Sequence, residues 1–371
     1  MKLLVLKETV ENEKRVALTP DLISKYNKFG YDVVVESGAG NAVSISDEEY
    51  TKAGASVTSD LSGAIASADV ILKVQSPTTS EAQKLSGAKK EVILIGILNP
   101  HQNTEQTAIY KNAGIKAFAT ELFPRITRAQ SMDVLSSQSN LVGYRAVIDG
   151  VSELGVAVPM MMTAAGTITP AKIMVLGAGV AGLQAIATAK RLGAVISAFD
   201  VRAAAKEQVE SLGAKFIEVP VAANDGADGE TKAGYAKEMS EEYKQRQAKV
   251  IFDNIIKQDI VITTALIPGK PAPKLITADM VKAMKPGAII VDIAAVNGGN
   301  CELTESGKVV EKHGVKILGY NNFASRIAKD ASKLYAKNLY NFVELITDKT
   351  EKKIKIDLED EIIKSSLVTS N

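Results

Sequence analysis

Short apolar runs alternate with polar or amphipathic stretches along most of this chain of 371 residues. Apolar runs bounded by polar residues are typical of buried strands, whereas apolar residues spaced three and four apart indicate helices. In the first third of the chain, the predicted strands are Lys2–Leu6, Asp32–Val35, Val70–Val74, Glu91–Ile97 and Lys116–Ala119, and the predicted helices include Leu22–Phe29, Glu48–Ala53 and Thr104–Ala113. This alternation predicts a largely parallel sheet flanked by helices.

A long helical pattern follows these strands. Val134, Leu141 and Ile148 recur at sevenfold spacing, which predicts a helix from Ser131 to about Leu154 that connects two domains. Beyond it, the predicted strands are Ile173–Leu176, Val195–Phe199, Lys215–Val219, Asp259–Thr263, Ala288–Asp292 and Val315–Leu318. Six strands with helices between them suit a complete doubly wound sheet.

The end of the chain contains one more helical stripe and then a tail. The stripe consists of Ala331, Leu334, Leu339, Phe342, Val343 and Ile346. Because the second sheet is already complete, this helix is expected to cross back to the first domain. We therefore divide the chain into a first domain of residues 1–135 plus 322–371 and a second of 136–321. The tail, 355–371, shows no clear core face and is expected to be a partly ordered extension.

A glycine-rich turn follows the first strand of the second domain. Gly177, Gly179 and Gly182 form a G-x-G-x-x-G pattern between an apolar run and a helix, and the next strand ends on Asp200. Gly177 permits the tight turn, Gly179 lets the backbone approach a pyrophosphate, and Gly182 allows close packing of helix and strand. This context predicts a dinucleotide site. The predicted fold class is therefore α/β, with two Rossmann-like doubly wound domains, mainly parallel sheets and a cleft between them.

Asp200 bears on the choice of cofactor. A carboxylate at this position accepts hydrogen bonds from the adenosine ribose and repels a 2′-phosphate, which favours NAD(H). Arg202 follows two residues later and is able to pair with such a phosphate, so NADP stays open as an alternative.

Composition narrows the classes of function. The hydrophobic fraction is 46%, the charged fraction 23% and the net charge +1, which is typical of a soluble globular protein without a nucleic-acid footprint. Cys301 is the only cysteine, so we expect no disulfide, no thiolate metal cluster and a reducing, cytoplasmic compartment. The apolar stretch from Val156 to Ile168 is too short for a membrane span.

Candidates for acid–base or metal chemistry are few. The chain has two histidines. His101 follows a predicted strand, at the edge of the sheet where sites of α/β proteins open, so it is a candidate functional residue. His313 is expected at an exposed helix end. Neither shows metal-ligand spacing, and we predict no metal site.

A polar segment before the long helix forms a second candidate site. Gln130, Asp133 and Ser136 lie three apart, so a helix would place an amide, a carboxylate and a hydroxyl along one ridge, with Arg125 and Arg128 just before it. Such a ridge suits a carboxamide, a ribose or a phosphate. The alternative is a helix cap with solvated arginines.

Residues 219–250 form an unusually long, polar connection. A connection of this length is either a solvated insertion or a lid, and its position after the third predicted strand of the nucleotide-binding domain favours a lid over the nucleotide.

Several motifs resemble the family of alanine dehydrogenase and proton-translocating nicotinamide nucleotide transhydrogenase, over nearly the whole chain. They are Lys7-Glu8, Arg15-Val16-Ala17-Leu18-Thr19-Pro20, Lys73-Val74-Gln75-Ser76-Pro77 and the glycine turn. In the alanine dehydrogenase branch, a histidine and an aspartate act as acid and base, but Asn99 and Val296 stand at those positions here. Arg15 and Lys73 match the amino-acid-binding residues of that branch. Alanine dehydrogenase therefore remains the alternative enzyme.

The transhydrogenase branch matches better. Its NAD(H)-binding component is similar to this chain in the segment from Pro124 to Asp133 and in 136–140, 182–185, 200–202 and 234–240. The resemblance implies that Arg125, Gln130, Asp133 and Ser136 hold the nicotinamide and that Tyr235 belongs to a loop closing over NAD(H). The cofactor contacts it implies are Arg125, Ile126, Thr127, Gln130, Gly177, Gly179, Val180, Gly182, Asp200, Val201, Arg202, Gly234, Tyr235, Gln247, Thr264 and Leu266.

This resemblance also implies a reaction and partners. The reaction is Re/Si-specific hydride transfer between NADH and NADP⁺, coupled to proton translocation; it needs positioning and exclusion of water rather than a general base. NAD(H) is then an exchanged substrate, and NADP(H) binds a beta-subunit partner. Membrane subunits would hold a homodimer of this chain peripherally at the inner membrane. A non-catalytic NAD(H)-sensing module is the alternative outside enzymes.

Overall fold

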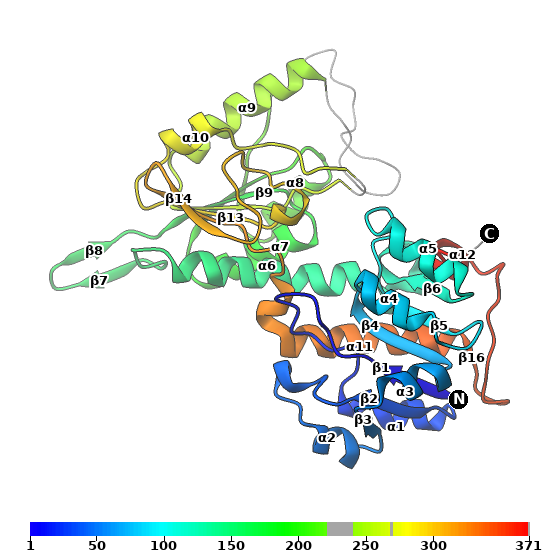
Figure 1. Cartoon of the computed structure of the whole chain (residues 1–371). Helices are drawn as coiled ribbons and strands as arrows, with labels where there is room; N and C mark the ends of the chain where they lie inside the picture. Colours follow the sequence, from blue (N-terminus) through cyan, green and yellow to red (C-terminus); the bar gives the residue numbers. More distant parts are fainter. Residues whose placement is uncertain (221–239, 268–269, 370–371) are drawn as a thin grey trace. The chain divides into compact units, whose positions relative to one another are not determined.

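The computed structural model describes residues 1–220, 240–267 and 270–369. It divides into two compact units, Met1–Gln138 with Ala324–Asn371 (unit 1) and Ser139–Phe323 (unit 2). Each unit contains a mainly parallel sheet with helices, which confirms the predicted α/β class (Figure 1).

The sheet of unit 1 has six parallel strands in the order β3-β2-β1-β4-β5-β6. The strands are β1 (Lys2–Val5), β2 (Asp32–Glu36), β3 (Ser56–Thr58), β4 (Val70–Gln75), β5 (Ile93–Ile97) and β6 (Lys116–Ala119). All five strands predicted for this region form. The short edge strand β3 was not predicted, because its three residues, none of them fully buried, give no apolar run. The connections reverse direction between β1 and β4, so this is the topological switch point of the sheet.

Helices cover both faces of this sheet. They are α1 (Pro20–Lys28), α2 (Asp47–Lys52), α3 (Leu61–Ser67), α4 (Thr79–Leu85), α5 (Thr104–Asn112), α11 (Ala328–Leu345) and α12 (Glu361–Ser366), with 3-10 turns η1 (Asn41–Val43), η2 (Thr120–Leu122), η3 (Thr127–Met132) and η5 (Ala324–Ile327). The apolar stripe of α11 packs into one buried cluster with β1, β2 and β4. In that cluster Phe342 of α11 contacts Phe118 of β6, at 5.2 Å between ring centroids. The opposite face of the sheet is buried under α3, α4 and α5.

The C-terminal tail differs from its prediction as a partly ordered extension. It follows the small antiparallel pair β16 (Thr347–Asp348) and β17 (Lys353–Ile354), and its described residues, 355–369, lie against unit 1 through α12. Ile362 and Ile363 are buried, and the Val368 N–H donates to the Ala117 carbonyl on the edge strand β6 at 2.9 Å. Two adjacent isoleucines are too short a pattern to reveal a core face, and their partners are distant in sequence.

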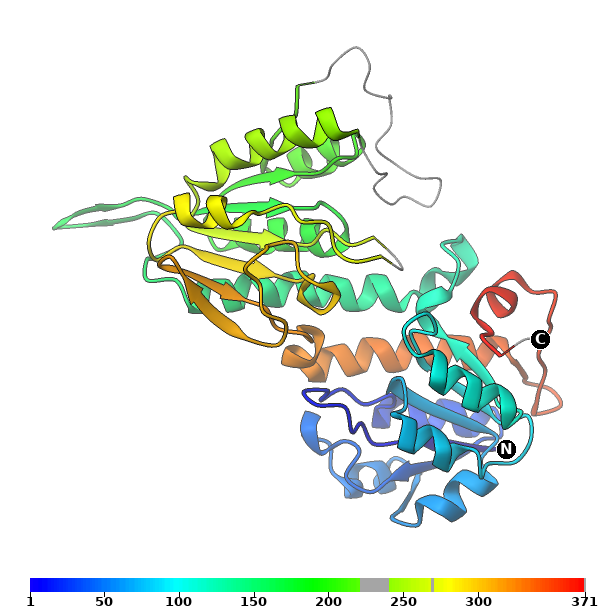
Figure 2. The ribbon, with the colours of Figure 1, turned by 45° about the horizontal axis from the view of Figure 1, so that its top comes forward.

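The sheet of unit 2 has seven strands in the order β11-β10-β9-β12-β13-β15-β14, of which only β14 is antiparallel. Figure 2 shows strands of this sheet in green to orange. The strands are β9 (Lys172–Leu176), β10 (Val195–Phe199), β11 (Lys215–Phe216), β12 (Ile260–Thr263), β13 (Ile289–Asp292), β14 (Val309–Lys312) and β15 (Val315–Leu318). Strand β14 was not predicted, because exposed and half-exposed residues alternate along it. His313 consequently lies in the β14–β15 turn, with φ +54°, and not at the predicted helix end. The switch point lies between β9 and β12.

The remaining elements are α6 (Val134–Ser152), α7 (Val180–Arg191), α8 (Ala205–Ser211), α9 (Glu241–Ile255), α10 (Ala278–Ala283), η4 (Ala295–Asn297), β7 (Met161–Thr163) and β8 (Gly166–Ile168). Gly143 of α6 lies directly against α7, because a Cβ built on it would meet the Ala181 carbonyl oxygen at 2.0 Å. The apolar stretch before β9 forms an exposed β7–β8 hairpin, in which Met162 is 82% exposed. Among the described residues, no helix is long and apolar enough to cross a membrane.

Candidate nucleotide site

The switch point of the unit 2 sheet is occupied by the glycine turn. Gly177 follows β9 directly and has φ +101°, a conformation that favours glycine. Its carbonyl accepts a hydrogen bond from the Thr264 hydroxyl at 3.0 Å, and the Thr264 N–H donates to the Leu176 carbonyl at 2.8 Å. Thr264 follows β12, so the loops after the two central strands are hydrogen-bonded to each other where a ligand is expected.

The three glycines differ in what surrounds them. A Cβ on Gly182 would lie 1.9 Å from the Gly177 carbonyl oxygen, and a Cβ on Gly177 would lie 2.5 Å from the Thr264 hydroxyl. A Cβ on Gly179 would meet no described protein atom within 4 Å. Gly177 and Gly182 are therefore required by protein packing, whereas Gly179 borders open space at the N-terminus of α7. The first N–H groups of a helix have no acceptor within it, so this space suits a phosphate.

Asp200 lies at the end of β10, beside the glycine turn. Its carboxylate accepts the Ala178 N–H at 2.7 Å and forms an ion pair with Arg202, at 2.9 Å between Oδ2 and the nearer guanidinium nitrogen. The Arg202 N–H and Nε also donate to Asp200, at 2.9 and 3.0 Å. The cation that would attract a 2′-phosphate is therefore already neutralised by Asp200.

The other cofactor contacts predicted in unit 2 differ in how far they are buried. Val180 and Leu266 are exposed, Val201 is half-buried, and Gln247 is buried on α9. Gly234 and Tyr235 lie outside the described residues, as does most of the predicted lid. Asn300 was not predicted: it is a buried residue whose side chain holds the loop after β12, and no recognisable motif surrounds it.

The polar segment of unit 1 does not form the predicted ridge. Gln130 lies in the 3-10 turn η3, and α6 begins only at Val134, so Gln130, Asp133 and Ser136 do not share one helix. Asp133 instead caps α6: its Oδ1 accepts the Ser136 N–H at 2.9 Å, and its Oδ2 accepts the Ser136 hydroxyl. This pairing places one carboxylate and one hydroxyl together and confirms the capping alternative for Asp133.

The remaining residues of that segment have different surroundings. Arg125, Thr127 and Gln130 are exposed, whereas Ile126 packs against the unit 1 core. Arg128 makes two hydrogen bonds to Asp360, at 2.5 and 2.9 Å. This pairing lowers the pKa of Asp360. Arg128 is therefore committed to holding the C-terminal tail rather than a ligand.

The switch point of the unit 1 sheet is filled by charged side chains. Lys73 of β4 is fully buried, and its Nζ lies 3.4 Å from Glu8 and 3.2 Å from Glu81. Glu8 follows β1 and accepts the N–H groups of Val74 and Gln75, at 2.6 and 3.2 Å. Burial raises the pKa of Glu8 to about 7, although the Lys73 charge and these hydrogen bonds act in the opposite direction.

A second buried pair lies beside it. Arg15 donates to both oxygens of Glu13, at 2.9 and 2.6 Å, and to Gln138 at 2.8 Å. Gln75 and Ser325 also donate to Glu13, each at 2.9 Å. Burial alone would raise the pKa of Glu13, but the hydrogen bonds and the charge of Arg15 lower it to about 2. Both cations that match the amino-acid-binding residues of alanine dehydrogenase are thus paired with carboxylates of this chain.

The two positions that replace the acid and the base are also described. Asn99 has φ +45°, and its N–H donates to the Glu121 carboxylate at 2.5 Å. His101 and Val296 are exposed. Within the described ranges no group of three or more His, Cys, Asp or Glu side chains is arranged to hold a metal ion.

The chain matches two family domains. Residues 4–142 match the N-terminal domain and residues 146–371 the C-terminal domain of "Alanine dehydrogenase/PNT". Over 371 residues it is 53% identical to the first part of NAD(P) transhydrogenase subunit alpha of Rhodospirillum rubrum, covering 100% of this chain and 96% of that protein. It is 27% identical to Bacillus subtilis alanine dehydrogenase, covering 88% of this chain and 81% of that protein.

Solved structures agree with these matches. The transhydrogenase from Sinorhizobium meliloti superposes with a TM-score of 0.87 at 51% identity, covering 99% of this chain and 97% of the other. An L-alanine dehydrogenase superposes with a TM-score of 0.76 at 23% identity, covering 98% of each chain, which shows a shared fold. The sequence resemblance is confirmed: this chain belongs to the alanine dehydrogenase/transhydrogenase family, and it is similar over its full length to the first part of the alpha subunit of NAD(P) transhydrogenase.

Proposed function

We propose that this chain is the NAD(H)-binding component of a proton-translocating transhydrogenase. The observation that carries the proposal is the Gly177–Gly182 turn at the unit 2 switch point, with open space beside Gly179, in a chain 53% identical to a transhydrogenase alpha subunit. When bound, NADH supplies a hydride, and the acceptor is the nicotinamide of NADP⁺ on a partner.

The residues of this chain then have positioning roles. The N-terminal N–H groups of α7 bind the pyrophosphate. The Asp200 carboxylate accepts hydrogen bonds from the adenosine ribose hydroxyls while it stays paired with Arg202. Arg125, Ile126, Thr127, Gln130, Asp133 and Ser136 are proposed to hold the nicotinamide end. Gly234, Tyr235, Val180, Val201, Gln247, Thr264 and Leu266 are proposed as further cofactor contacts.

Two observations weigh against an alanine dehydrogenase. The Arg15 and Lys73 cations are already paired with Glu13, Glu8 and Glu81 and so do not need a substrate carboxylate. Asn99 and Val296, at the positions of the acid and the base, have side chains that do not titrate near neutral pH. Transfer of a hydride between two nicotinamides moves no proton to a heteroatom, so it needs neither group.

The partners follow from the same proposal. The R. rubrum relative is named as one portion of an alpha subunit. We propose that separate components bind NADP(H) and translocate protons, with Re/Si-specific transfer, and that this chain is a cytoplasmic homodimer held at the inner membrane by those components. The exposed apolar hairpin β7–β8, with Met162, Ile168 and the preceding Met160, supplies a surface suited to a second protein chain.

The test measures transfer and NADH affinity separately. We expect Gln130→Ala and Asp133→Asn to lower hydride transfer by about tenfold or more, with the NADP(H)-binding and membrane components present, and to change the NADH dissociation constant less than about threefold. Asparagine at 133 keeps an oxygen for the helix cap but removes the charge, so a loss of transfer would not reflect an uncapped α6. Gln83→Ala, at an exposed glutamine of α4, is the matched control.

Unchanged transfer in both variants would reject the proposed roles of Gln130 and Asp133. The purified chain is also assayed for NAD-dependent oxidation of alanine, because robust turnover would establish the alternative enzyme. Tight NADH binding without transfer in the presence of every partner component would instead favour an NAD(H)-sensing module.

A further inference from the structure

We propose that Asn300 and Asp292 are positioning residues of the NAD(H) site. They fix the loop after β12, residues Thr264–Leu266, against the Gly177 turn. This inference rests on the proposed binding of NAD(H) at that turn. Both side chains are fully buried, so they act through the loop and not through contact with the nucleotide.

The side-chain amide of Asn300 makes hydrogen bonds to both backbone groups of Ala265, a residue of that loop; we call this pair of bonds the Asn300 clamp. The Asn300 Oδ1 accepts the Ala265 N–H at 3.0 Å, and the Nδ2 donates to the Ala265 carbonyl at 2.8 Å. The same Nδ2 donates to the Pro273 carbonyl at 2.8 Å. Only an amide offers an acceptor and two donors in this geometry; a carboxylate would place negative charge against two carbonyl oxygens.

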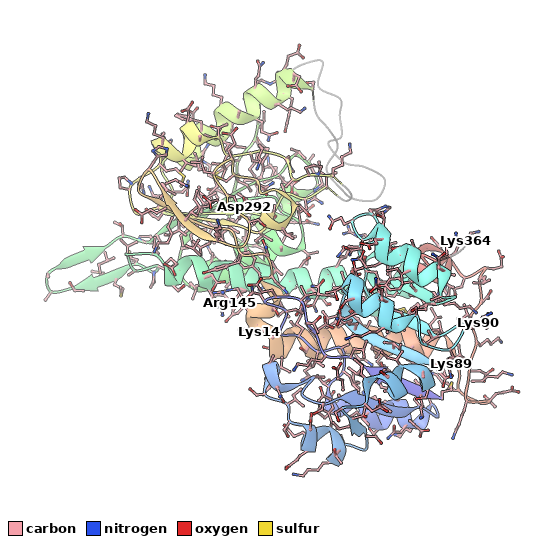
Figure 3. The ribbon with its side chains drawn as sticks, viewed as in Figure 1. Lys14, Lys89, Lys90, Arg145, Asp292 and Lys364 are labelled. Carbon is pink, nitrogen blue, oxygen red and sulfur yellow. The ribbon has the colours of Figure 1, made fainter. Side chains whose placement is uncertain are left out.

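Asp292 holds the end of the neighbouring strand. It is the last residue of β13, and Figure 3 labels it among the side chains of unit 2. Its Oδ1 accepts the Thr263 hydroxyl at 2.9 Å and the Ala294 N–H at 3.1 Å. Its Oδ2 accepts the Cys301 N–H at 3.0 Å and the Thr304 hydroxyl at 2.6 Å. The carboxylate therefore joins the end of β12 to both ends of the loop that carries Asn300.

Thr264 transmits this restraint to the glycine turn. It stands between Thr263, which is bonded to Asp292, and Ala265, which is bonded to Asn300. Its own hydroxyl donates to the Gly177 carbonyl. A shift of Thr264 would thus release the carbonyl that precedes the phosphate-binding helix. Because binding geometry is sensitive to small displacements, we expect the loss of the Asn300 clamp or of the Asp292 hydrogen bonds to weaken NADH binding.

The test compares two buried amides at opposite ends of β12. Asn300→Ala removes the clamp, whereas Gln258→Ala removes a buried amide that donates to the Asn254 carbonyl before β12 begins. We expect the NADH dissociation constant of the purified chain, measured by fluorescence titration, to rise about tenfold or more in Asn300→Ala and less than about twofold in Gln258→Ala. In the reconstituted transfer reaction, the KM for NADH should rise while kcat changes less than about threefold.

A second pair of variants, with side chains close in shape to the originals, distinguishes loss of these hydrogen bonds from misfolding. Thr263→Val keeps the shape of the side chain and removes only its hydrogen bond to Asp292, and we expect a roughly two- to fivefold weaker affinity for NADH. Asn300→Asp should bind at least as weakly as Asn300→Ala. Wild-type affinity in Asn300→Asp, or equal affinity losses in Asn300→Ala and Gln258→Ala, would overturn the inference.

Failure of the proposed function gives a different result. A wild-type chain that binds NADH but transfers no hydride with its partners would reject the transhydrogenase proposal and leave the affinity comparison intact. A wild-type chain that does not bind NADH would overturn both.

Discussion

The two sheets of this protein have the same kind of switch point and use it in opposite ways. In unit 2, the loops after β9 and β12 meet through backbone and hydroxyl groups, and Gly179 leaves space beside them. In unit 1, the corresponding place between β1 and β4 is filled by Lys73 and its two carboxylate partners. A parallel sheet with a reversed strand order provides a place for a ligand. The side chains after its strands decide whether a ligand or the protein itself occupies that place.

Charge and size explain this difference. Glycines leave backbone N–H groups accessible, which suits an anion from outside the chain. Long charged side chains fill the volume and neutralise one another, and removal from water makes each of them dependent on its partner. Tyr335 of α11 closes this region further, because its hydroxyl donates to the Lys73 carbonyl at 2.8 Å. The unit 1 switch point has therefore become part of the core.

The largest effect is expected from removing the central cation of unit 1. Lys73→Met leaves the buried Glu8 and the half-buried Glu81 without their common partner, which should lower the free energy of unfolding by about 3–5 kcal/mol. Chemical denaturation of the NADH-free chain measures this loss. NADH affinity should stay within about threefold of the wild type under conditions where the variant is folded.

The control for that variant removes the charges together. Glu8→Gln, Lys73→Met and Glu81→Gln combined should recover most of the lost stability, because an apolar or neutral set of similar volume does not leave an uncompensated charge. A single Lys73→Met variant as stable as the wild type would contradict the interpretation of this region as an internally paired site.

An intermediate effect is expected at the glycine turn. Gly182→Ala places a methyl group where the Gly177 carbonyl lies, and this overpacking should destabilise unit 2 by about 1–3 kcal/mol and abolish NADH binding. Gly179→Ala is the matched variant, since its methyl group enters open space. We expect an unchanged melting temperature and NADH binding weaker by about tenfold or more, measured by fluorescence titration. Unaltered affinity would show that the phosphate does not lie there.

The smallest expected effect is on how the melting temperature depends on pH. Burial raises the pKa of Glu8 from 4.5 to about 7, so the folded protein binds this proton more tightly than the unfolded chain does. The stability contributed by the bound proton is present below about pH 4.5 and is lost as the pH rises through about 7. Glu8→Gln should therefore gain in melting temperature relative to the wild type between about pH 5 and pH 8. Glu48→Gln, at an exposed carboxylate of α2, should show no such trend, and parallel curves for Glu8→Gln and the wild type would reject the assignment.

Much of the fold was predictable because its signals are local. The parallel strands are apolar runs, and the glycine turn, its helix and the acidic end of β10 follow within one βαβ unit. Edge elements were harder to predict. The packing of α12 depends on neighbours that are distant in sequence, and the strands β3 and β14 are short and partly exposed, so they do not show a clear periodicity.

The polar segment before α6 shows another limit of prediction. The spacing of Gln130, Asp133 and Ser136 would form a ridge only in a continuous helix, but the helix begins at Val134 and Asp133 caps it. Asp133 was a good candidate both for a ligand-binding ridge and for a helix cap, and residue spacing did not distinguish these two roles. Arg128 was similarly ambiguous until its partner Asp360, from the C-terminal tail, was located.

By itself, the sequence determined the α/β class, the glycine turn, the acidic residue at the end of β10 and the family, because each is recognised from short motifs or apolar runs whose residues are close together in the chain. Only the tertiary structure decided which charges neutralise one another and which loops support the turn. The Lys73–Glu8 and Asn300–Ala265 contacts join residues 65 and 35 positions apart. Such pairings arise from strand order and packing, and no local pattern encodes them.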